Sequence, residues 1–219
     1  MIKIEKVAVY GFNEAIRGMR NSWNSHDKSD TPSTMSDDEA TGEWKIGEND
    51  KELIMRLVRA GDAHAKCMRM VTVWFDLTAP IYFWKHLDTY KHVVKCSESV
   101  MHTITKREIV KEDFSFDAMD MVSEISAPIF KAVIDALNIM RKKYLFFTDR
   151  DPKAQKTWWE RIIKLLPQSY MQKATICTNY QTLRNIYLQR KGHRLDEWQQ
   201  FREWIEGLPY SEFITGRTE

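Results

Sequence analysis

The sequence predicts a single helix-dominant α+β domain that spans residues 1–219. Several segments repeat apolar residues every three or four positions, which is typical of amphipathic helices. Fewer and shorter runs are rich in β-branched and aromatic residues, which favour strands. A chain of 219 residues is only slightly longer than a typical single domain, and it can bury a sizeable core without disulfide or metal cross-links.

The N-terminal part of the chain combines short regular elements with one long irregular segment. We expect, in chain order, an edge strand over 2–10, a helix over 12–20, a long loop over 21–49 and a helix over 50–60. Asn49 is predicted to cap the second helix and Gly61 to end it. Loops as long as 21–49 are either mobile surface segments or functional lids, and the sequence leaves both alternatives open.

The middle of the chain contains a buried strand and the clearest helix. Residues 68–77 are rich in Val, Trp and Phe and are predicted to form the strand. The dipeptide Ala79-Pro80 is expected to open a short helix, because proline is tolerated in a first turn. The clearest helix covers 116–144, and its apolar stripe indicates a surface that faces the core. Pro128 predicts a kink or a restart within it.

The C-terminal part contains three further amphipathic patterns. We expect helices over 152–166, 179–190 and 196–205, and a strand or crossing segment over 171–178. Pro167 ends the first of these helices and Gly192 the second.

Composition excludes several classes of function. The net charge is +2, from 33 Lys and Arg against 31 Asp and Glu, which gives no reason to expect a nucleic-acid partner. No apolar stretch reaches about 18 residues, so we expect no membrane span. The N-terminus lacks the apolar core of a signal peptide, and the three scattered cysteines suggest free buried thiols in a reducing, cytoplasmic compartment. No cluster has metal-ligand spacing, and no glycine-rich phosphate loop or serine elbow is present.

Two segments nevertheless combine residues that carry chemistry. The first, 79–102, alternates aromatic residues with cations and then reaches hydroxyl groups; the polar members are Lys85, His86, Lys91, His92, Lys95, Ser97, Glu98 and Ser99. Cations and hydroxyls near a helix end suit a phosphate or another anion. The solvated basic face of an ordinary helix explains the same pattern, so this segment alone does not decide between them.

The second segment, 166–190, places an amide and a guanidinium on one predicted helix. Asn179 and Arg190 are eleven residues apart, which is about three turns, so both are expected on one side and ~16 Å apart along the axis. Semi-buried polar groups on an apolar face need partners. The partner is either a carboxylate of the same chain or a bound ligand.

Taken together, the two segments resemble the flavin-dependent thymidylate synthases. That family has a strand ending in Ala-Pro-Ile, an Arg-His-Arg-x-x-Ser-x-Asn-Glu-x-Ser-x-Arg signature, and a later Leu-Pro followed by a helix reading Asn-x-Arg-x-Leu-x-x-x-x-x-x-Arg. The matching residues here are Ala79-Pro80-Ile81, Ser99, Leu166-Pro167, Asn179, Leu183, Asn185 and Arg190. Ser97 stands where the family has its signature glutamate, and a slip of one residue would place the adjacent Glu98 there. Arginines of the family are replaced by Thr89, Met101 and Gln181, its signature histidine by Tyr90 and the last arginine of the triplet by Lys91.

The resemblance implies a role for each matched position. Arg190 would polarise the uracil ring as the catalytic residue. The implied substrate contacts are Ser97, Ser99, His86 and Lys91, and the implied cofactor contacts are Tyr90, Lys91, Glu98, Asn179, Asn185 and His64, a histidine shortly before the strand. The ring of Tyr90 could still stack on a flavin or folate ring.

The implied fold is helix-rich around a small, mainly antiparallel sheet. The implied reaction is methylation of deoxyuridine monophosphate at C5, with FAD as cofactor and NADPH and methylene-tetrahydrofolate as co-substrates. The family assembles as a homotetramer with active sites at subunit interfaces. Two alternatives follow from the replaced arginines: an enzyme that modifies another uracil nucleotide, and a catalytically silent member that binds a nucleotide or a protein partner.

Overall fold

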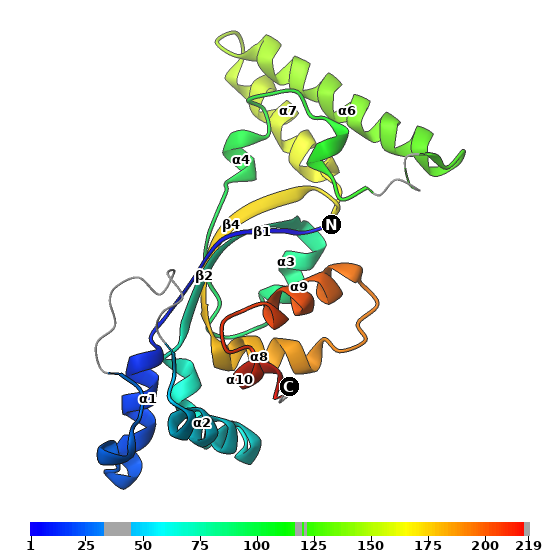
Figure 1. Ribbon diagram of the computed structural model, residues 1–219. Helices are drawn as coiled ribbons and strands as arrows, with labels where there is room; N and C mark the ends of the chain where they lie inside the picture. Colours follow the sequence, from blue (N-terminus) through cyan, green and yellow to red (C-terminus); the bar gives the residue numbers. More distant parts are fainter. Residues whose placement is uncertain (33–44, 117–119, 121, 217–219) are drawn as a thin grey trace. The chain divides into compact units, whose positions relative to one another are not determined.

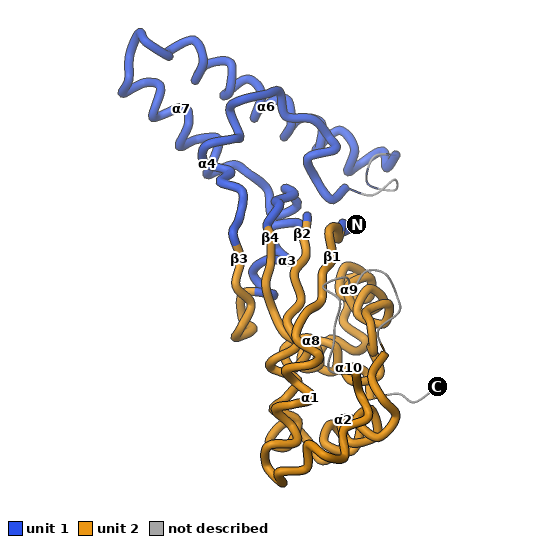
Figure 2. Tube along the Cα trace, turned by 60° about the vertical axis from the view of Figure 1, so that its left-hand side comes forward, with its two compact units in different colours: residues 1–3, 78–87, 96–174 blue, residues 4–77, 88–95, 175–219 orange. Residues whose placement is uncertain are grey.

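The computed structural model describes residues 1–32, 45–116, 120 and 122–216 (Figure 1). These residues form two compact units, which Figure 2 colours separately. Unit 1 contains 1–3, 78–87 and 96–174, and unit 2 contains 4–77, 88–95 and 175–219. Each unit is therefore assembled from segments that are far apart in the sequence.

One four-stranded antiparallel sheet is formed by the described residues. Its strands are β1 Lys3–Tyr10, β2 Thr72–Pro80, β3 Val94–Ser97 and β4 Met171–Asn179, paired in the order β1-β2-β4-β3. The predicted α+β class and the edge position of 2–10 are confirmed. The open alternative for 171–178 is resolved as a strand. The division into units falls within these strands, so each unit holds one end of them.

Two predictions for the strands were wrong. The buried strand begins at Thr72, because Lys66–Arg69 form a short 3-10 helix, and it continues through Pro80. Ala79-Pro80 therefore ends a strand, and helix α3 Ile81–Leu87 follows directly. The sequence analysis also missed β3, because all four of its residues are exposed and an exposed strand carries no apolar pattern.

Unit 2 contains helices α1 Phe12–Arg20, α2 Glu48–Ala60, α8 Tyr180–Gln189, α9 Asp196–Glu206 and α10 Glu212–Thr215. The first four were predicted to within two residues at each end. The short α10 was not, because four residues are too few to show a helical period. Aromatic rings dominate the core: Phe75 contacts Phe201 and Trp204 with ring centroids 6.1 and 4.5 Å apart, and Trp198 and Tyr180 are fully buried.

Residues 21–32 are tied to the start of α2. They form two short 3-10 helices, Asn21–Trp23 and His26–Lys28. The Asp30 carboxylate accepts the backbone N–H groups of Asn49 and Asp50 at 2.9 and 3.2 Å, so it caps the helix in place of the predicted Asn49. Gly47 permits this approach, since a Cβ there would lie 2.2 Å from Oδ1 of Asp30. The rest of the predicted lid, 33–44, lies outside the described residues.

Asp50 is the second link between this segment and α2. Its carboxylate is fully buried and accepts hydrogen bonds from Arg20 Nε at 2.6 Å, Ser29 Oγ at 2.7 Å and Thr31 Oγ1 at 2.6 Å. Burial by itself raises the pKa of Asp50, but the hydrogen bonds from Thr31, Ser29 and Arg20 outweigh it and hold the pKa below its usual value. The described part of the predicted loop is thus a hydrogen-bonded structure.

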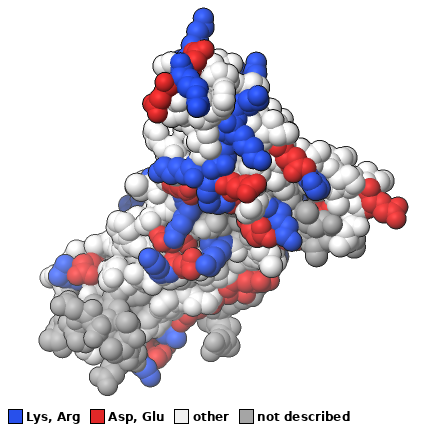
Figure 3. Space-filling view, turned by 90° about the horizontal axis from the view of Figure 1, so that it is seen from above, with Lys and Arg blue, Asp and Glu red and all other residues white. Residues whose placement is uncertain are grey.

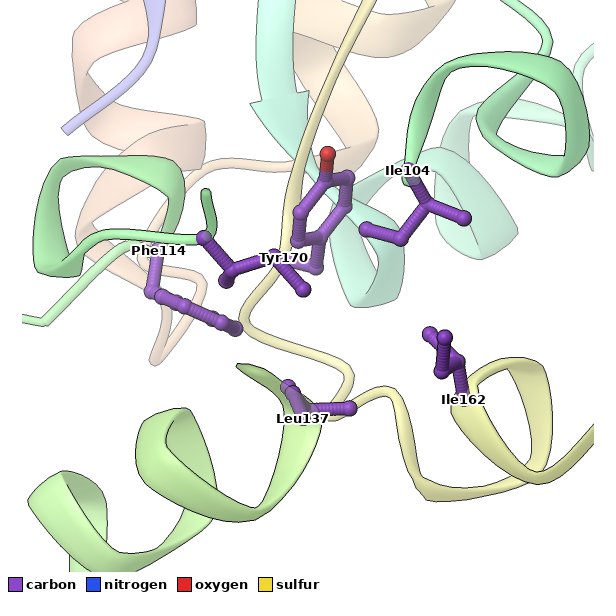
Figure 4. Packing of buried hydrophobic residues seen from close by; sticks show 6 residues of the cluster. Ile104, Phe114, Leu137, Ile162 and Tyr170 are labelled. Carbon is purple, nitrogen blue, oxygen red and sulfur yellow. The ribbon is translucent and has the colours of Figure 1, made fainter. Parts of the chain in front are cut away.

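Unit 1 is built on an α-helical pair, α6 Ser126–Phe147 and α7 Pro152–Leu165, which pack against each other. The short helix α4 Val100–Thr103 precedes them in the chain. Figure 4 shows the apolar cluster of this unit, with Leu137 and Ile162 from the helix pair meeting Ile104, Phe114 and Tyr170. Burial, which disfavours the phenolate, raises the pKa of Tyr170 to about 12, with smaller effects from Asp113 and Glu98.

The apolar stripe predicted over 116–144 is only partly a core surface. The helix restarts at Ser126, as Pro128 predicted, and the residues at 117–119 and 121 lie outside the described part. Leu137 is fully buried, whereas Val122, Ile125 and Ile129 are 73%, 78% and 58% exposed. The partner helix has 14 residues against 22 in α6, so the helix pair cannot cover the full length of the stripe.

The surface and the thiols complete the description. On the face drawn in Figure 3, Lys and Arg side chains are interspersed with Asp and Glu. No helix among the described residues is long and apolar enough to cross a membrane. Cys67 is buried, Cys177 is half-buried and Cys96 is exposed, so the prediction of three buried thiols was wrong for Cys96.

Candidate functional site

The predicted Asn179–Arg190 helix is present, but the two side chains flank it. Asn179 has extended backbone angles (φ −140°, ψ 166°), so it ends β4 and caps α8, and its Oδ1 accepts the Thr182 N–H at 2.9 Å. Arg190 is the residue that follows the last turn. The expectation that both groups project from one helix face was therefore wrong, because the first helical residue is Tyr180. Leu183, Ile186 and Tyr187 are buried, as predicted.

The guanidinium of Arg190 lies against two aromatic rings of unit 2. Its Cζ is 4.5 Å from the centroid of the Trp198 ring and 5.2 Å from that of Tyr90. The Trp198 and Tyr90 rings pack edge to face, with centroids 6.3 Å apart and an interplanar angle of 62°. The structure therefore brings together two of the predicted site residues, Tyr90 and Arg190, through a third residue that the sequence analysis did not single out.

Arg190 has an unused donor at this position. Its Nε is buried and has no hydrogen-bond partner among the described residues. Other arginines of unit 2 donate to the protein: Arg20 to Asp50, Arg184 to the Ile214 carbonyl and Arg202 to the Tyr187 carbonyl. The alternative of a carboxylate partner for Arg190 finds no support, since the described residues form no ion pair with it.

Three more side chains of unit 2 have buried polar atoms without a partner among the described residues. They are the hydroxyl of Tyr90, the hydroxyl of Thr178, and both amide atoms of Gln181. Thr178 and Gln181 are 3% and 6% exposed and lie on either side of the Asn179 cap. A buried polar group without a hydrogen bond costs about 1–3 kcal/mol, so such a concentration calls for a ligand or ordered water.

The segment 88–95 lies beside α8 within unit 2. The Lys91 carbonyl accepts a long hydrogen bond, 3.4 Å, from the Thr182 hydroxyl, while the Lys91 side chain is exposed. Lys95 pairs with Asp88. The cations of the predicted basic face are thus partly solvated. The aromatic residue of this segment, Tyr90, contacts Arg190 instead.

The remaining predicted residues are distributed over both units. In unit 1, Ser97, Glu98 and Ser99 are exposed and His86 is half-buried. The Glu98 carboxylate accepts the Thr103 hydroxyl at 2.9 Å, and its backbone N–H donates to the Lys173 carbonyl at 2.8 Å. In unit 2, Asn185 is half-buried on α8, and His64 is exposed in the turn that follows α2.

Two functional candidates escaped the sequence analysis. Trp198 lies on the buried face of α9, and an apolar periodic position on a helix predicts core packing only. Thr178 lies at an inward position of β4, where the alternation of the strand would favour an apolar residue. That break in alternation was the one signal available for it.

The two large cavities and the thiols contribute no residue to the cluster around Arg190. One hollow of about 900 Å³ in unit 2 is lined mainly by α2, and another of about 820 Å³ in unit 1 is lined by α6 and residues 108–112. Neither includes a predicted site residue. Burial raises the pKa of the Cys67 and Cys177 thiols, which disfavours a nucleophilic thiolate at either position. No group of His, Cys, Asp and Glu among the described residues could hold a metal ion.

Comparison with known proteins identifies the fold. No protein-family profile and no curated protein sequence matches the chain. A crystal structure of thymidylate synthase X from Helicobacter pylori with FAD and dUMP matches with a TM-score of 0.66 at 16% identity, covering 97% of this chain and 96% of that chain. A second structure of the flavin-dependent thymidylate synthase from that organism, complexed with FAD and dUMP, gives 0.65 at 16%, covering 98% and 100%.

A different enzyme matches almost as well. The UMP/dUMP methylase PolB from Streptomyces cacaoi, bound with 5-Br dUMP, has a TM-score of 0.61 at 17% identity, covering 99% of this chain and 95% of that chain. At these identities the likeness establishes the fold. The chain thus has the flavin-dependent thymidylate synthase fold over nearly its whole length, as the two sequence segments predicted.

Proposed function

We propose that this protein methylates a uracil nucleotide at C5, with FAD as cofactor and with NADPH and methylene-tetrahydrofolate as co-substrates. The fold supports this proposal, and so do the residues at the matched motif positions. The observation that carries it is the state of Arg190: a half-buried guanidinium, packed on two rings, with a buried Nε that no described residue engages.

The chemistry requires such a cation. C5 of uracil is a weak nucleophile, and it attacks a one-carbon unit readily only when negative charge develops on the ring and its carbonyl oxygens beforehand. A guanidinium that donates to the N3–C4 edge stabilises that charge and does not need to move a proton. Removal of a group in this role typically costs about 3 kcal/mol of transition-state stabilisation. We assign this role to Arg190.

The residues around α8 fit a ligand rich in hydrogen-bonding groups. Both donors and acceptors are available here. They are the hydroxyls of Tyr90 and Thr178 and the amide of Gln181, which have no hydrogen-bond partner among the described residues. A bound flavin supplies the hydride that completes the methyl group. We assign Asn179, Asn185, Tyr90, Lys91, Glu98 and His64 to flavin binding, and Ser97, Ser99, His86 and Lys91 to nucleotide binding. Gln181 replaces a cationic residue of the family motif, so its contact would be to an uncharged polar group.

Self-association is part of the proposal. Three large apolar side chains are exposed near the start of α6: Val122 and Ile125 just before the helix, and Ile129 in its first turn. Exposed apolar surface of this kind is typical of contacts between subunits. We propose a homotetramer whose sites form between subunits. Ile129→Glu is expected to reduce the mass measured by sedimentation, whereas Lys131→Glu on the same helix should leave it unchanged.

Two measurements test the proposed function: flavin absorbance of the purified protein, and release of tritium from C5 of the nucleotide. The purified protein is expected to show flavin absorbance, or to acquire it on incubation with FAD. Tritium released from C5 of deoxyuridylate, dependent on methylene-tetrahydrofolate and NADPH, would establish the reaction. Release from uridylate instead would identify the other acceptor. A colourless protein that takes up no flavin and releases no tritium would favour a silent protein that binds a nucleotide or a protein partner.

A further inference from the structure

We propose that Trp198 is a positioning residue for Arg190: its indole ring holds the guanidinium in place while leaving its Nε–H available to a ligand. The identity of that ligand rests on the proposed function, but the holding contact does not. Trp198 is fully buried, lies on α9 outside both motif segments, and contacts the guanidinium more closely than Tyr90 does.

An aromatic ring holds a guanidinium differently from a carboxylate. A carboxylate binds the N–H groups themselves and neutralises the charge. The face of an aromatic ring attracts the cation through its π-electrons and uses none of the in-plane donors. A guanidinium held in this way keeps its charge and its directional N–H edge, which are the two properties required for recognition of a carbonyl-bearing ring.

A second arginine of the same unit shows what a purely structural pair looks like. Arg202 also lies over a ring, with its Cζ 4.3 Å from the centroid of Tyr187. Its Nε donates to the Tyr187 carbonyl at 3.0 Å and its Nη1 to the Gln199 side chain at 3.2 Å. Arg202 therefore donates hydrogen bonds to other groups of the fold. Arg190 has a similar ring contact, but its Nε–H has no hydrogen-bond partner among the described residues.

The indole is itself fixed. Its ring meets Phe201 and His193 edge-on, with centroids 5.8 and 6.1 Å away, and the Trp198 backbone N–H donates to the Leu195 carbonyl at 3.0 Å. A ring locked on several sides presents one surface to the guanidinium. Arg190 follows the last turn of α8, and its backbone N–H donates to the Ile186 carbonyl at 2.9 Å while its carbonyl accepts the His193 N–H at 3.2 Å. The backbone is therefore held by the protein, and the Trp198 ring acts on the side chain.

The test compares Trp198→Phe and Trp198→Leu with a matched control, Trp158→Leu. Trp158 in unit 1 also has an arginine over its ring, Arg161, at 4.4 Å, but this arginine is exposed. The first readout is the nuclear magnetic resonance signal of the Arg190 Nε–H, assigned by its loss in Arg190→Lys. We expect a ring-current shift that is lost in Trp198→Leu, reduced in Trp198→Phe and unchanged in the control.

The second readout is turnover of deoxyuridylate by the flavin-loaded protein. Loss of a desolvated cation–π contact is expected to reduce kcat by about 10- to 30-fold in Trp198→Leu, with a smaller change in KM. Trp198→Phe, which keeps a ring, should stay within about 3-fold, and the control should match the wild type. If Trp198→Leu does not fold, Trp198→Phe carries the test: a reduced shift supports the positioning role, and an unchanged shift overturns it.

Two outcomes separate the inference from the proposed function. An Arg190 signal that is unchanged in folded Trp198→Leu would overturn the positioning role, whatever the activity. A ring-shifted signal that responds to Trp198 substitution but not to added deoxyuridylate, in a protein without turnover, would keep the positioning role and reject the proposed function.

Discussion

The guanidinium carbon of Arg190 lies 5.2 Å from the centre of the Tyr90 ring, so the end of α8 and segment 88–95 meet within one unit. In the family that this chain resembles, the position of Tyr90 carries a histidine. An uncharged phenol ring beside the guanidinium attracts the cation, whereas a protonated imidazole would repel it. The replacement is therefore compatible with a charged Arg190 at this position.

Arg190→Ala is expected to leave the fold and the flavin colour largely intact while reducing turnover by about two orders of magnitude or more. The physical reason is that the cation acts on charge that develops during the reaction. Circular dichroism, flavin absorbance and tritium release measure the three quantities. Arg161→Ala, which removes an exposed arginine that also lies over a tryptophan, is the control and should match the wild type. Equal losses of thermal stability and activity would indicate a structural role instead.

Tyr90→Phe is expected not to lower the free energy of unfolding, because the deleted hydroxyl has no hydrogen-bond partner among the described residues. Affinity for nucleotide or flavin should fall, measured by calorimetric titration. Tyr180→Phe is the matched control: its hydroxyl donates to the Pro209 carbonyl, so that variant should lose about 1 kcal/mol. The reverse ranking of stabilities would show that the Tyr90 hydroxyl is satisfied within the protein.

Gln181→Met is expected to raise the free energy of unfolding by about 1 kcal/mol in urea titrations, since it replaces a buried unpaired amide by an apolar chain of similar size. Ligand affinity should decrease at the same time. Gln189→Met, at an exposed position of the same helix, should change neither quantity. A variant that is less stable yet binds ligand normally would contradict the ligand-binding role of Gln181.

Asp50→Asn is expected to destabilise the protein by about 3 kcal/mol at pH 7, because a buried, hydrogen-bonded charge pair with Arg20 is broken. The pKa of Asp50 is lowered from 3.8 in the folded state, so its stabilising contribution is complete above that value. It is lost as the pH falls from 3.8 through the folded pKa. The stability difference between wild type and variant should therefore be constant near neutrality and shrink in acid.

Chemical denaturation between pH 3 and 7 measures this difference. Asp135→Asn serves as the control, since Asp135 forms an exposed pair with Lys131 on α6 and such pairs contribute about 0–1 kcal/mol. A difference for Asp50→Asn that grows in acid would contradict the assignment.

The elements that the sequence predicted well are those whose pattern is local. Helices α1, α7 and α9 were placed to within a residue at each end, because amphipathic periods and breakers such as Pro167 act over one or two turns. The Asn49 cap was mispredicted because a remote side chain, Asp30, supplies the acceptor. Strand β3 was missed because edge strands with two solvated faces need no apolar residues.

The candidate site shows the same division. The motif residues near Ala79 and along α8 were sufficient to identify the fold, because the sequence itself gives their identity and spacing. The spacing of residues along the sequence could not predict that Trp198 contacts Arg190 or that the Asn179 side-chain oxygen caps α8. Nor could it predict that the Gln181 amide is buried without a hydrogen-bond partner among the described residues. These facts depend on contacts between segments distant in the sequence. Which hydrogen bonds a buried group makes is decided by what folding places around it.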